Sequence, residues 1–209
     1  DLQGVILDLR GNGGGMLHEA INVCNVFIPA EETVVTTRSK VVESDQKYKT
    51  RNEPVDQTIL LVVIIDESSA SASEIVSGVM QDLDRGVIIG QLSYGKGLVQ
   101  NTFDVWYNAK VKLTTAKYYI PSGRCIQSVE YKNGERVHIA DDKRAEFKTR
   151  AGRTVLDGGG VQPDVPMIAE QQPLIVKKLL EQDIIFNFVT QQYMGEDSIA
   201  ALEEFRFTD

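Results

Sequence analysis

The sequence has little of what marks several protein classes. With two cysteines it lacks a disulfide framework, and Cys24 and Cys125 are expected to be free thiols rather than a bridge. It also lacks any apolar run near the roughly 18 residues of a transmembrane helix. A basic excess is absent too, because the formal net charge is −8 and the pI about 4.9. Nothing in that balance points to nucleic acid or to an anionic membrane surface as a partner.

The most informative stretch runs from Leu60 to Gln100. It opens with an unbroken aliphatic run, Leu60 to Ile65, which predicts a strand buried on both faces. A serine-rich turn follows, and apolar residues then recur at helical spacing from Ile75 to Leu83. This order places one serine at a helix N-terminus, where unpaired N–H groups and the helix dipole favour a developing negative charge. The serines of the turn are Ser68, Ser69, Ser71 and Ser73.

Two other interpretations of this stretch need no nucleophile. Ser71 with Glu74 fits a capping box, although capping needs one hydroxyl and the turn contains four serines. Gly90 to Gly97 fits the phosphate-loop pattern G-x-x-x-x-G-K, but glycine follows the lysine where that loop requires serine or threonine for magnesium. The residues after it alternate like a strand instead of opening a helix, so the phosphate-loop interpretation is weak.

Several motifs resemble the carboxyl-terminal processing proteases, also called tail-specific proteases. They occur in the family's order over most of the chain. The motifs are SASASEI at Ser69–Ile75, QDLDRGVIIG after it, SYGKGLVQ at Ser93–Gln100, DLRGNGGG at Asp8–Gly15, LTTAKYYIPSGRCIQ at Leu113–Gln127 and GGGVQPD at Gly158–Asp164. Several motifs in the right order are a far more specific signal than any single short motif.

The chain as a whole alternates strands with helices at first and then becomes strand-rich. A helix is expected from Leu17 to Phe27, ended by Pro29, and a hairpin or surface loop over residues 39–57. Strands are expected over residues 5–9, 33–37, 60–65, 86–90, 98–105 and 110–119. This order predicts an α/β fold, a mixed β-sheet with flanking helices. The resemblance adds that the fold is a crotonase-like serine protease core.

A single protease core is expected over residues 1–209, because 209 residues with 42% apolar content suffice for one substantial core. Residues 128–157 are charged and poor in large aliphatics, which predicts an insertion or extended hairpin. Residues 172–205 are expected to form C-terminal helices. The chain begins without methionine and no PDZ-like segment precedes Asp1, so we interpret it as a fragment. Such a fragment is expected to fold but to cleave tail-bearing substrates slowly.

The resemblance implies which residues form the site. A serine becomes a nucleophile only when a neighbouring group takes its proton. The family motif assigns the nucleophile to Ser71, the base to Lys96 and the orientation of that lysine to Gln100. On a strand, positions 96 and 100 point to the same face, so the pairing of Lys96 with Gln100 is geometrically reasonable. A Ser-His-Asp triad is less well supported, because His18 and His138 are both expected to face solvent.

The glycine-rich turn after the first strand is either a loose turn that needs positive φ angles or a place where backbone approaches a site. The resemblance implies that the backbone N–H groups of Gly15 and Ala72 form an oxyanion hole. A side chain at Gly15 is therefore expected to crowd the site. Asp82, on the helix after the serines, either supports the site or has a structural or solvent-facing role.

The resemblance implies a serine endopeptidase with a Ser71–Lys96 dyad that uses no cofactor and no metal. It would cleave protein substrates near their carboxyl termini, in the periplasm or cell envelope. The protein or peptide substrate would bind as an extended strand at a sheet edge, and a homo-oligomer could form through regions outside this sequence. Two alternatives remain open: a catalytically silent peptide-binding module on the same scaffold, and a crotonase-like acyl hydrolase.

Overall fold

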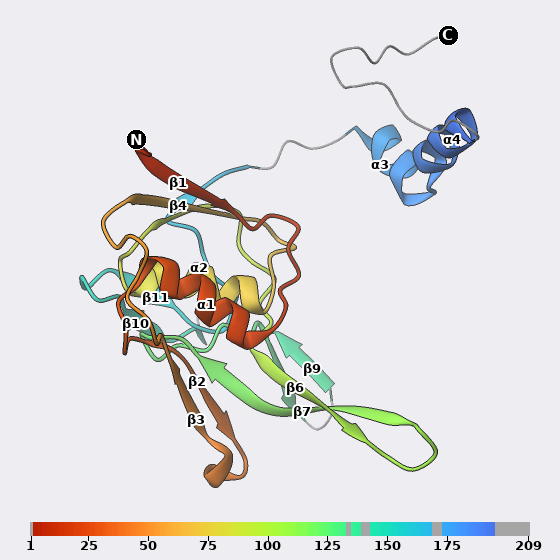
Figure 1. Ribbon diagram of the computed structural model, residues 1–209. Coiled ribbons are helices and arrows are strands. Elements are labelled where there is room, and N and C mark those ends of the chain that lie inside the picture. The colour runs from red at the N-terminus through yellow and green to blue at the C-terminus, as the bar shows by residue number, and fades with distance from the viewer. Residues whose placement is uncertain (1, 133–134, 139–142, 169–172, 195–209) are drawn as a thin grey trace. The chain divides into compact units, whose positions relative to one another are not determined.

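The computed structural model describes residues 2–132, 135–138, 143–168 and 173–194 (Figure 1). The chain divides into two compact units, Asp1–Ile168 and Ala169–Asp209, where the sequence suggests a single domain. The second unit contains α3 (Leu174–Glu181) and α4 (Ile184–Tyr193). A further helix expected over residues 198–205 lies outside the described residues. None of the described helices is long and apolar enough to span a membrane.

A parallel sheet forms one layer of the first unit. Its strands are β1 (Gly4–Asp8), β4 (Leu60–Ile65), β5 (Val87–Gly90) and β12 (Val165–Pro166), in the order β1-β4-β5-β12. Along β4, Leu61, Val63 and Ile65 are buried while Leu60 is 74% exposed. The prediction that this strand is buried on both faces is therefore wrong. Among the described residues of the first unit, the helices α1 (Leu17–Phe27) and α2 (Ala72–Asp82) pack on one face of this sheet.

An antiparallel sheet forms the opposite layer. Its strands are β3 (Gln46–Lys49), β2 (Thr33–Ser39), β7 (Lys110–Tyr119) and β6 (Leu98–Asp104), in the order β3-β2-β7-β6. A short 3-10 turn, Val42–Ser44, joins β2 to β3. The α/β class is confirmed, but parallel and antiparallel strands lie in separate sheets rather than in one mixed sheet. The β6–β7 register shifts between Val99 and Gln100, so regular alternation breaks there.

Two helices fill the space between the sheets (Figure 1). They are α1 (Leu17–Phe27) and α2 (Ala72–Asp82). Every residue of α2 is buried, because apolar residues of both sheets and of α1 surround it. One hydrophobic core contains Val63 of the parallel sheet, Val79 of α2 and Val35 of the antiparallel sheet. A helix enclosed in this way must satisfy its polar groups through protein contacts, since water does not reach them.

The segment predicted as an insertion over residues 128–157 forms two short hairpins. One pairs β8 (Val129–Lys132) with β9 (Glu135–His138), and the other pairs β10 (Glu146–Lys148) with β11 (Thr154–Leu156). The turn of the second hairpin contacts the core, where the Arg150 backbone N–H donates to the Asp82 carbonyl at 2.7 Å. Cys24 and Cys125 form no disulfide, as expected.

The C-terminal end of α2 is held by a buried ion pair. Arg124 Nη2 lies 2.9 Å from Asp82 Oδ1, with side chains 1% and 0% exposed. Burial raises the pKa of Asp82, and the charge of Arg124 opposes that rise. Asp82 also accepts the Ser122 backbone N–H at 2.9 Å. The structure therefore gives Asp82 a structural position at the end of α2 rather than a solvent-facing one.

Replacing Arg124 tests how much the core depends on this pair. Arg124→Met should lower the free energy of unfolding by about 3–5 kcal/mol, because it leaves Asp82 buried without its counter-charge. Arg150→Met is the matched control: Arg150 pairs with Glu32 at 2.8 Å on the surface, and its loss should cost about 1 kcal/mol or less. Urea denaturation measures both, and equal losses would contradict the assignment.

Candidate active site

The serines of the turn before α2 have different contacts. Ser69 and Ser73 are buried, and their hydroxyls donate to oxygens within residues 9–12 at 2.8 and 2.9 Å. Ser68 is exposed on the surface. Ser71 lies at the N-cap of α2 and lines an open groove. Ser69 and Ser73 therefore hold the turn against the glycine-rich loop. Ser71 is half-buried and lines the groove.

The backbone of Ser71 has an unusual conformation. Its φ is 57° and its ψ −114°, a combination that costs a residue other than glycine about 1–3 kcal/mol. Such strain persists only where the surrounding structure enforces it, and it is concentrated at functional sites. The Ser71 N–H donates to Glu74 Oε2 at 2.8 Å, as in a capping box. Capping and nucleophilic chemistry are therefore compatible at this position.

Glu74 connects the start of α2 to the loop that carries Lys96. Its Oε2 accepts the backbone N–H groups of Ser71 and Lys96 at 2.8 and 2.9 Å. Its Oε1 accepts the Ser93 hydroxyl at 2.5 Å and the Gly95 N–H at 2.7 Å. Burial raises the pKa of Glu74, and these four hydrogen bonds oppose the rise. One carboxylate thus fixes Ser71 and Lys96 relative to each other.

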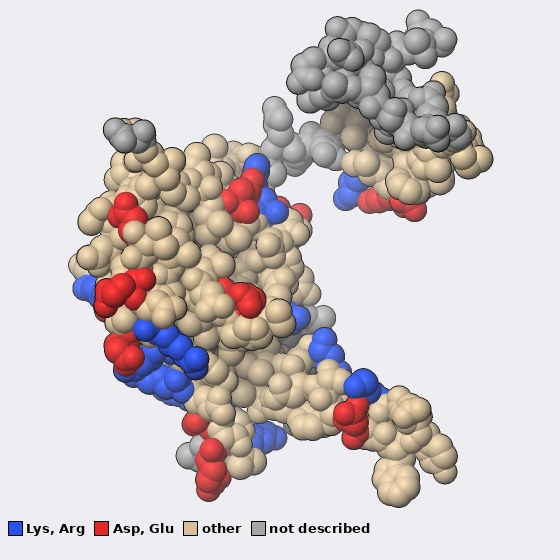
Figure 2. Space-filling view, in the orientation of Figure 1, with Lys and Arg blue, Asp and Glu red and all other residues tan. Residues whose placement is uncertain are grey.

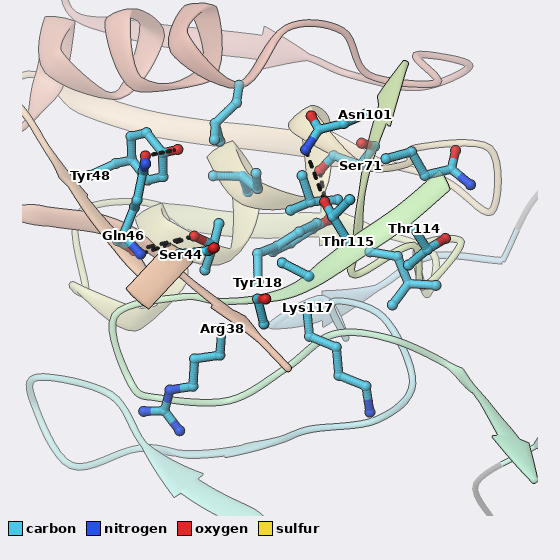
Figure 3. Close-up of a pocket in the computed structure, with 18 of the residues that line it drawn as sticks. Arg38, Ser44, Gln46, Tyr48, Ser71, Asn101, Thr114, Thr115, Lys117 and Tyr118 are labelled. Carbon is cyan, nitrogen blue, oxygen red and sulfur yellow. Dashed lines mark hydrogen bonds between the residues drawn. The ribbon is translucent and has the colours of Figure 1, made fainter. Parts of the chain in front are cut away.

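Tyr118 of β7 connects the same two residues on another side. Its hydroxyl contacts the carbonyl oxygen of Ser71 at 3.2 Å and also donates to the carbonyl of Lys96. Burial and the neighbouring charge of Glu74 raise the pKa of Tyr118, so the phenol keeps the proton that it donates. Figure 3 shows Tyr118 beside Ser71 in the groove. The antiparallel sheet therefore helps to place both candidate catalytic residues.

Lys96 and Gln100 line the groove but do not lie on one strand face. Lys96 is half-buried in the loop between β5 and β6, whereas Gln100 is exposed on β6, just beyond the register shift at Val99. The argument that positions 96 and 100 share a strand face is therefore wrong. Within the described residues no hydrogen bond joins the two side chains. Orientation of the lysine by Gln100 stays a prediction.

Gly15 and Ala72, whose backbone N–H groups are the expected oxyanion donors, line the same groove as Ser71. Neither N–H has a hydrogen-bond acceptor in the part of the chain that the structure describes. Close packing occurs one residue earlier, at Gly14, where φ is 94° and an added Cβ would lie 2.5 Å from the Ala70 carbonyl oxygen. A Cβ at Gly15 would meet nothing within 4 Å. The tight contact with the turn therefore belongs to Gly14, while the expectation that a side chain at Gly15 crowds the site stays a prediction.

Two polar side chains hold the glycine-rich loop against the turn. The Asp66 carboxylate accepts the Gly11 N–H at 3.0 Å, and Asn12 Oδ1 accepts the Gly14 N–H at 2.9 Å. Asn12 also accepts the Ser73 hydroxyl. The acidic residue directly after β4 thus has a structural explanation, and the loop that carries Gly15 is fixed beside Ser71.

The groove has a volume of about 1650 Å³ and lies between α1, α2 and the antiparallel sheet. Its described lining contains no Asp or Glu, although the chain carries a net charge of −8. The basic residues that line it are Arg38, Lys40, Lys96, Lys112 and Lys117. His18 lines its rim with a side chain 66% exposed, and the side chain of His138 lies outside the described residues. The lining favours an uncharged or anionic ligand.

Sequence reasoning did not identify Glu74 or Tyr118 as parts of the site. It treated Glu74 as a helix cap and did not single out Tyr118. One signal was available for Glu74: it is the first charged residue of a helix that is otherwise small and apolar until Asp82. A carboxylate in such a helix is buried, and a buried carboxylate needs several donors. The residues next to Glu74 in the sequence do not show which donors bind its carboxylate.

Comparisons with known proteins identify the family to which the chain is similar. The family model described as "Peptidase family S41" matches residues 1–137. The chain is similar to a carboxy-terminal-processing protease of Bartonella bacilliformis. The two are 41% identical over 128 residues, and the match covers 61% of this chain and 29% of that protein. It is also similar to a chloroplastic C-terminal processing peptidase of Tetradesmus obliquus, 32% identical over 126 residues, covering 60% of this chain and 27% of that protein.

Among solved structures, the chain is similar to a photosystem II D1 C-terminal processing protease. The TM-score is 0.60 and the sequence identity 26%, over 86% of this chain and 38% of that chain. The present chain therefore spans well under half of each of these relatives. The residues that the family model matches, 1–137, include Ser71 and Lys96.

Substitution at the glycines tests which one packs against the turn. Gly14→Ala should lower the free energy of unfolding by about 1–3 kcal/mol, because alanine is strained at positive φ and would meet the Ala70 carbonyl. Gly15→Ala should leave it within about 0.5 kcal/mol, since its φ is ordinary and the space is open. Urea midpoints of the two variants measure the difference, and a larger loss for Gly15→Ala would contradict it.

Glu74→Gln tests the carboxylate. An amide nitrogen at the Oε1 position lets the Ser93 hydroxyl turn round and accept, but it leaves the Gly95 N–H without an acceptor. One such buried donor should cost about 1–3 kcal/mol of stability. Glu67→Gln is the control, because Glu67 is an exposed residue of the same turn. Equal unfolding midpoints for the two variants would show that Glu74 is not a structural link.

Proposed function

The chain belongs to peptidase family S41, and on this premise we propose that it carries the catalytic residues of a serine endopeptidase. The substrates are proteins cleaved near their carboxyl termini, the activity that the names of two relatives describe for those proteins. Because the chain spans 29% and 27% of these relatives, the activity of the whole protein is part of the proposal.

One observation carries the proposal. A strained serine at the start of a buried helix shares a groove with a lysine and with two backbone N–H groups that lack acceptors among the described residues. Acyl transfer requires these parts: a nucleophile, a base and donors for the oxyanion. The α2 dipole also stabilises the oxyanion, since the positive end of the helix points to the groove. A peptide-binding module without catalysis would not need a strained serine.

The proposed reaction follows from these positions. Ser71 Oγ attacks the scissile carbonyl carbon while Lys96 Nζ, neutral at that moment, takes the hydroxyl proton. The N–H groups of Gly15 and Ala72 donate to the oxyanion, which can contribute about 3 kcal/mol for each donor. The intermediate collapses, the amine leaves with the proton from Lys96, and an acyl ester on Ser71 remains. Water, deprotonated by Lys96, then attacks the ester; Ser71 Oγ leaves and takes that proton back from Lys96, and the new carboxyl end is released.

Glu74 and Tyr118 are positioning residues in this scheme. Both bind backbone groups of Ser71 and Lys96 and leave the reactive side-chain atoms free. Gln100 is proposed to orient the Lys96 amine once substrate fills the groove.

The substrate is proposed to bind beside β6. In the described sheet β6 pairs only with β7, so its other edge is free to accept an extended peptide. The strand begins at Leu98, directly after the loop that carries Lys96. A peptide added there would pass the dyad with its backbone already aligned. The basic lining of the groove suits a segment that ends in a carboxylate.

We also propose a location in the periplasm or cell envelope. This location is proposed from the resemblance to the carboxyl-terminal processing proteases.

Cleavage of a fluorescently labelled unfolded protein tests the proposal. The wild-type chain should cleave it slowly but measurably. Ser71→Ala should lower the rate by about a thousandfold or more. Lys96→Arg should also abolish cleavage, because a guanidinium keeps its proton in a protein.

Two matched variants control for nonspecific effects. Ser68→Ala removes an exposed serine of the same turn, and Lys49→Arg changes a surface lysine that pairs with Glu31. Both should cleave like the wild type. An active Lys96→Arg variant would overturn the dyad but leave a serine peptidase. Cleavage that survives Ser71→Ala, or a wild-type chain without activity, would overturn the proposed function itself.

A further inference from the structure

The β6–β7 hairpin continues past the antiparallel sheet as a two-stranded arm. β2 pairs with β7 from Ala116 to Tyr119, and beyond that point the described strands pair only with each other. At about 3.3 Å per residue, the stretch from Ala109 to Ala116 carries the turn about 20 Å past this pairing. Figure 1 shows the arm pointing away from α1, α2 and the parallel sheet.

The turn at the end of the arm displays large apolar side chains to solvent. Trp106 is 88% exposed, Tyr107 99% and Val105 46%. The turn itself is ordered, because the Val105 N–H donates to the Ala109 carbonyl at 2.9 Å. Figure 2 shows that the end of this hairpin, at lower right, is free of charged residues. Contiguous exposed apolar surface of this kind is typical of an interaction site.

The local conformation gives a second sign of an external contact. Tyr107 and Asn108 have φ values of 62° and 56°, which places both central residues of the turn in the left-handed region. Asparagine and glycine suit these positions, whereas a tyrosine there is strained. Packing of the Tyr107 side chain does not offset the energy of this strain, since Tyr107 is almost fully exposed. A residue that opposes its local preference without a compensating contact indicates a role outside the folded chain.

Charges near the turn indicate what it contacts. Lys110 and Lys112 follow it, and Asp104 precedes it. Lys110 pairs with Asp104 at 2.7 Å, while exposed Lys112 has no ion pair in the described part of the chain. Residues 1–168, the unit that carries the arm, hold 22 Asp and Glu against 19 Lys and Arg, a formal net charge of only −3. The arm therefore presents an aromatic tip with a free lysine behind it.

We propose that the tip of the β6–β7 hairpin inserts into a lipid surface. Trp106 and Tyr107 enter the interfacial layer, where an aromatic ring can bury its apolar body and keep its polar atom hydrated. Lys112 then lies at the level of the headgroups and favours anionic lipids. This contact would hold the groove near a membrane through an arm that does not cross it. The inference does not depend on the proposed peptidase activity.

The emission of Trp106 tests insertion directly, because it is the chain's single tryptophan. The 209-residue chain is titrated with vesicles of phosphatidylcholine and phosphatidylglycerol, and with phosphatidylcholine alone. Emission should shift to shorter wavelength, at lower lipid concentration with the anionic vesicles. Trp106→Ser/Tyr107→Ser should weaken co-sedimentation roughly tenfold or more. Lys112→Gln should weaken it about fivefold on the anionic vesicles alone.

A matched variant in the second unit provides the control. Leu174→Ser/Phe186→Ser removes two apolar side chains that are 68% and 69% exposed, and it should leave co-sedimentation unchanged. Emission of Trp106 that vesicles do not shift would overturn the proposal. So would a Trp106→Ser/Tyr107→Ser variant that binds vesicles as tightly as the wild type. A shift that grows with protein concentration without lipid would assign the tip to a second copy of the chain instead.

Discussion

Four hydrogen bonds to the Glu74 carboxylate bring together two segments that are separated along the chain. Ser71 donates from the start of α2, and Ser93, Gly95 and Lys96 donate from the loop before β6. A buried carboxylate is stable only when its oxygens are satisfied, so the loop must close on α2 in one arrangement. The relative position of the candidate nucleophile and base depends on this interaction more directly than on their own side chains.

The reason for such a carboxylate lies in the place of α2. The helix is enclosed by α1 and by residues of both sheets, so its polar ends cannot be hydrated. Glu74 satisfies groups at its N-terminal end, and the Asp82–Arg124 pair satisfies groups at its C-terminal end. Between them the helix is apolar or small. The strained backbone of Ser71 is sustained because both the helix and the loop behind it are fixed by these contacts.

Part of the site followed from motifs and part did not. The family motifs assigned Ser71, Lys96, Gln100, Gly15 and Ala72, and the structure places all five on one groove. Their roles stay proposals. Strand alternation failed for Gln100, because Lys96 lies in a loop and the β6 register shifts at Val99. Sequence reasoning did not single out Gly14, whose N–H is held by Asn12 and which makes the close contact with the turn.

The sequence by itself determined the local elements of this protein. Aliphatic runs, helical spacing and the serine-rich turn depend on neighbouring residues, and strands and helices formed near the expected positions. Only the tertiary structure decided that β4 is covered on one face, that the strands divide into two sheets, and that Tyr118 and Glu74 join Ser71 to Lys96. These features arise from contacts between distant segments around one enclosed helix. No local period carries that information, because it depends on which surfaces remain to be buried after each element has formed.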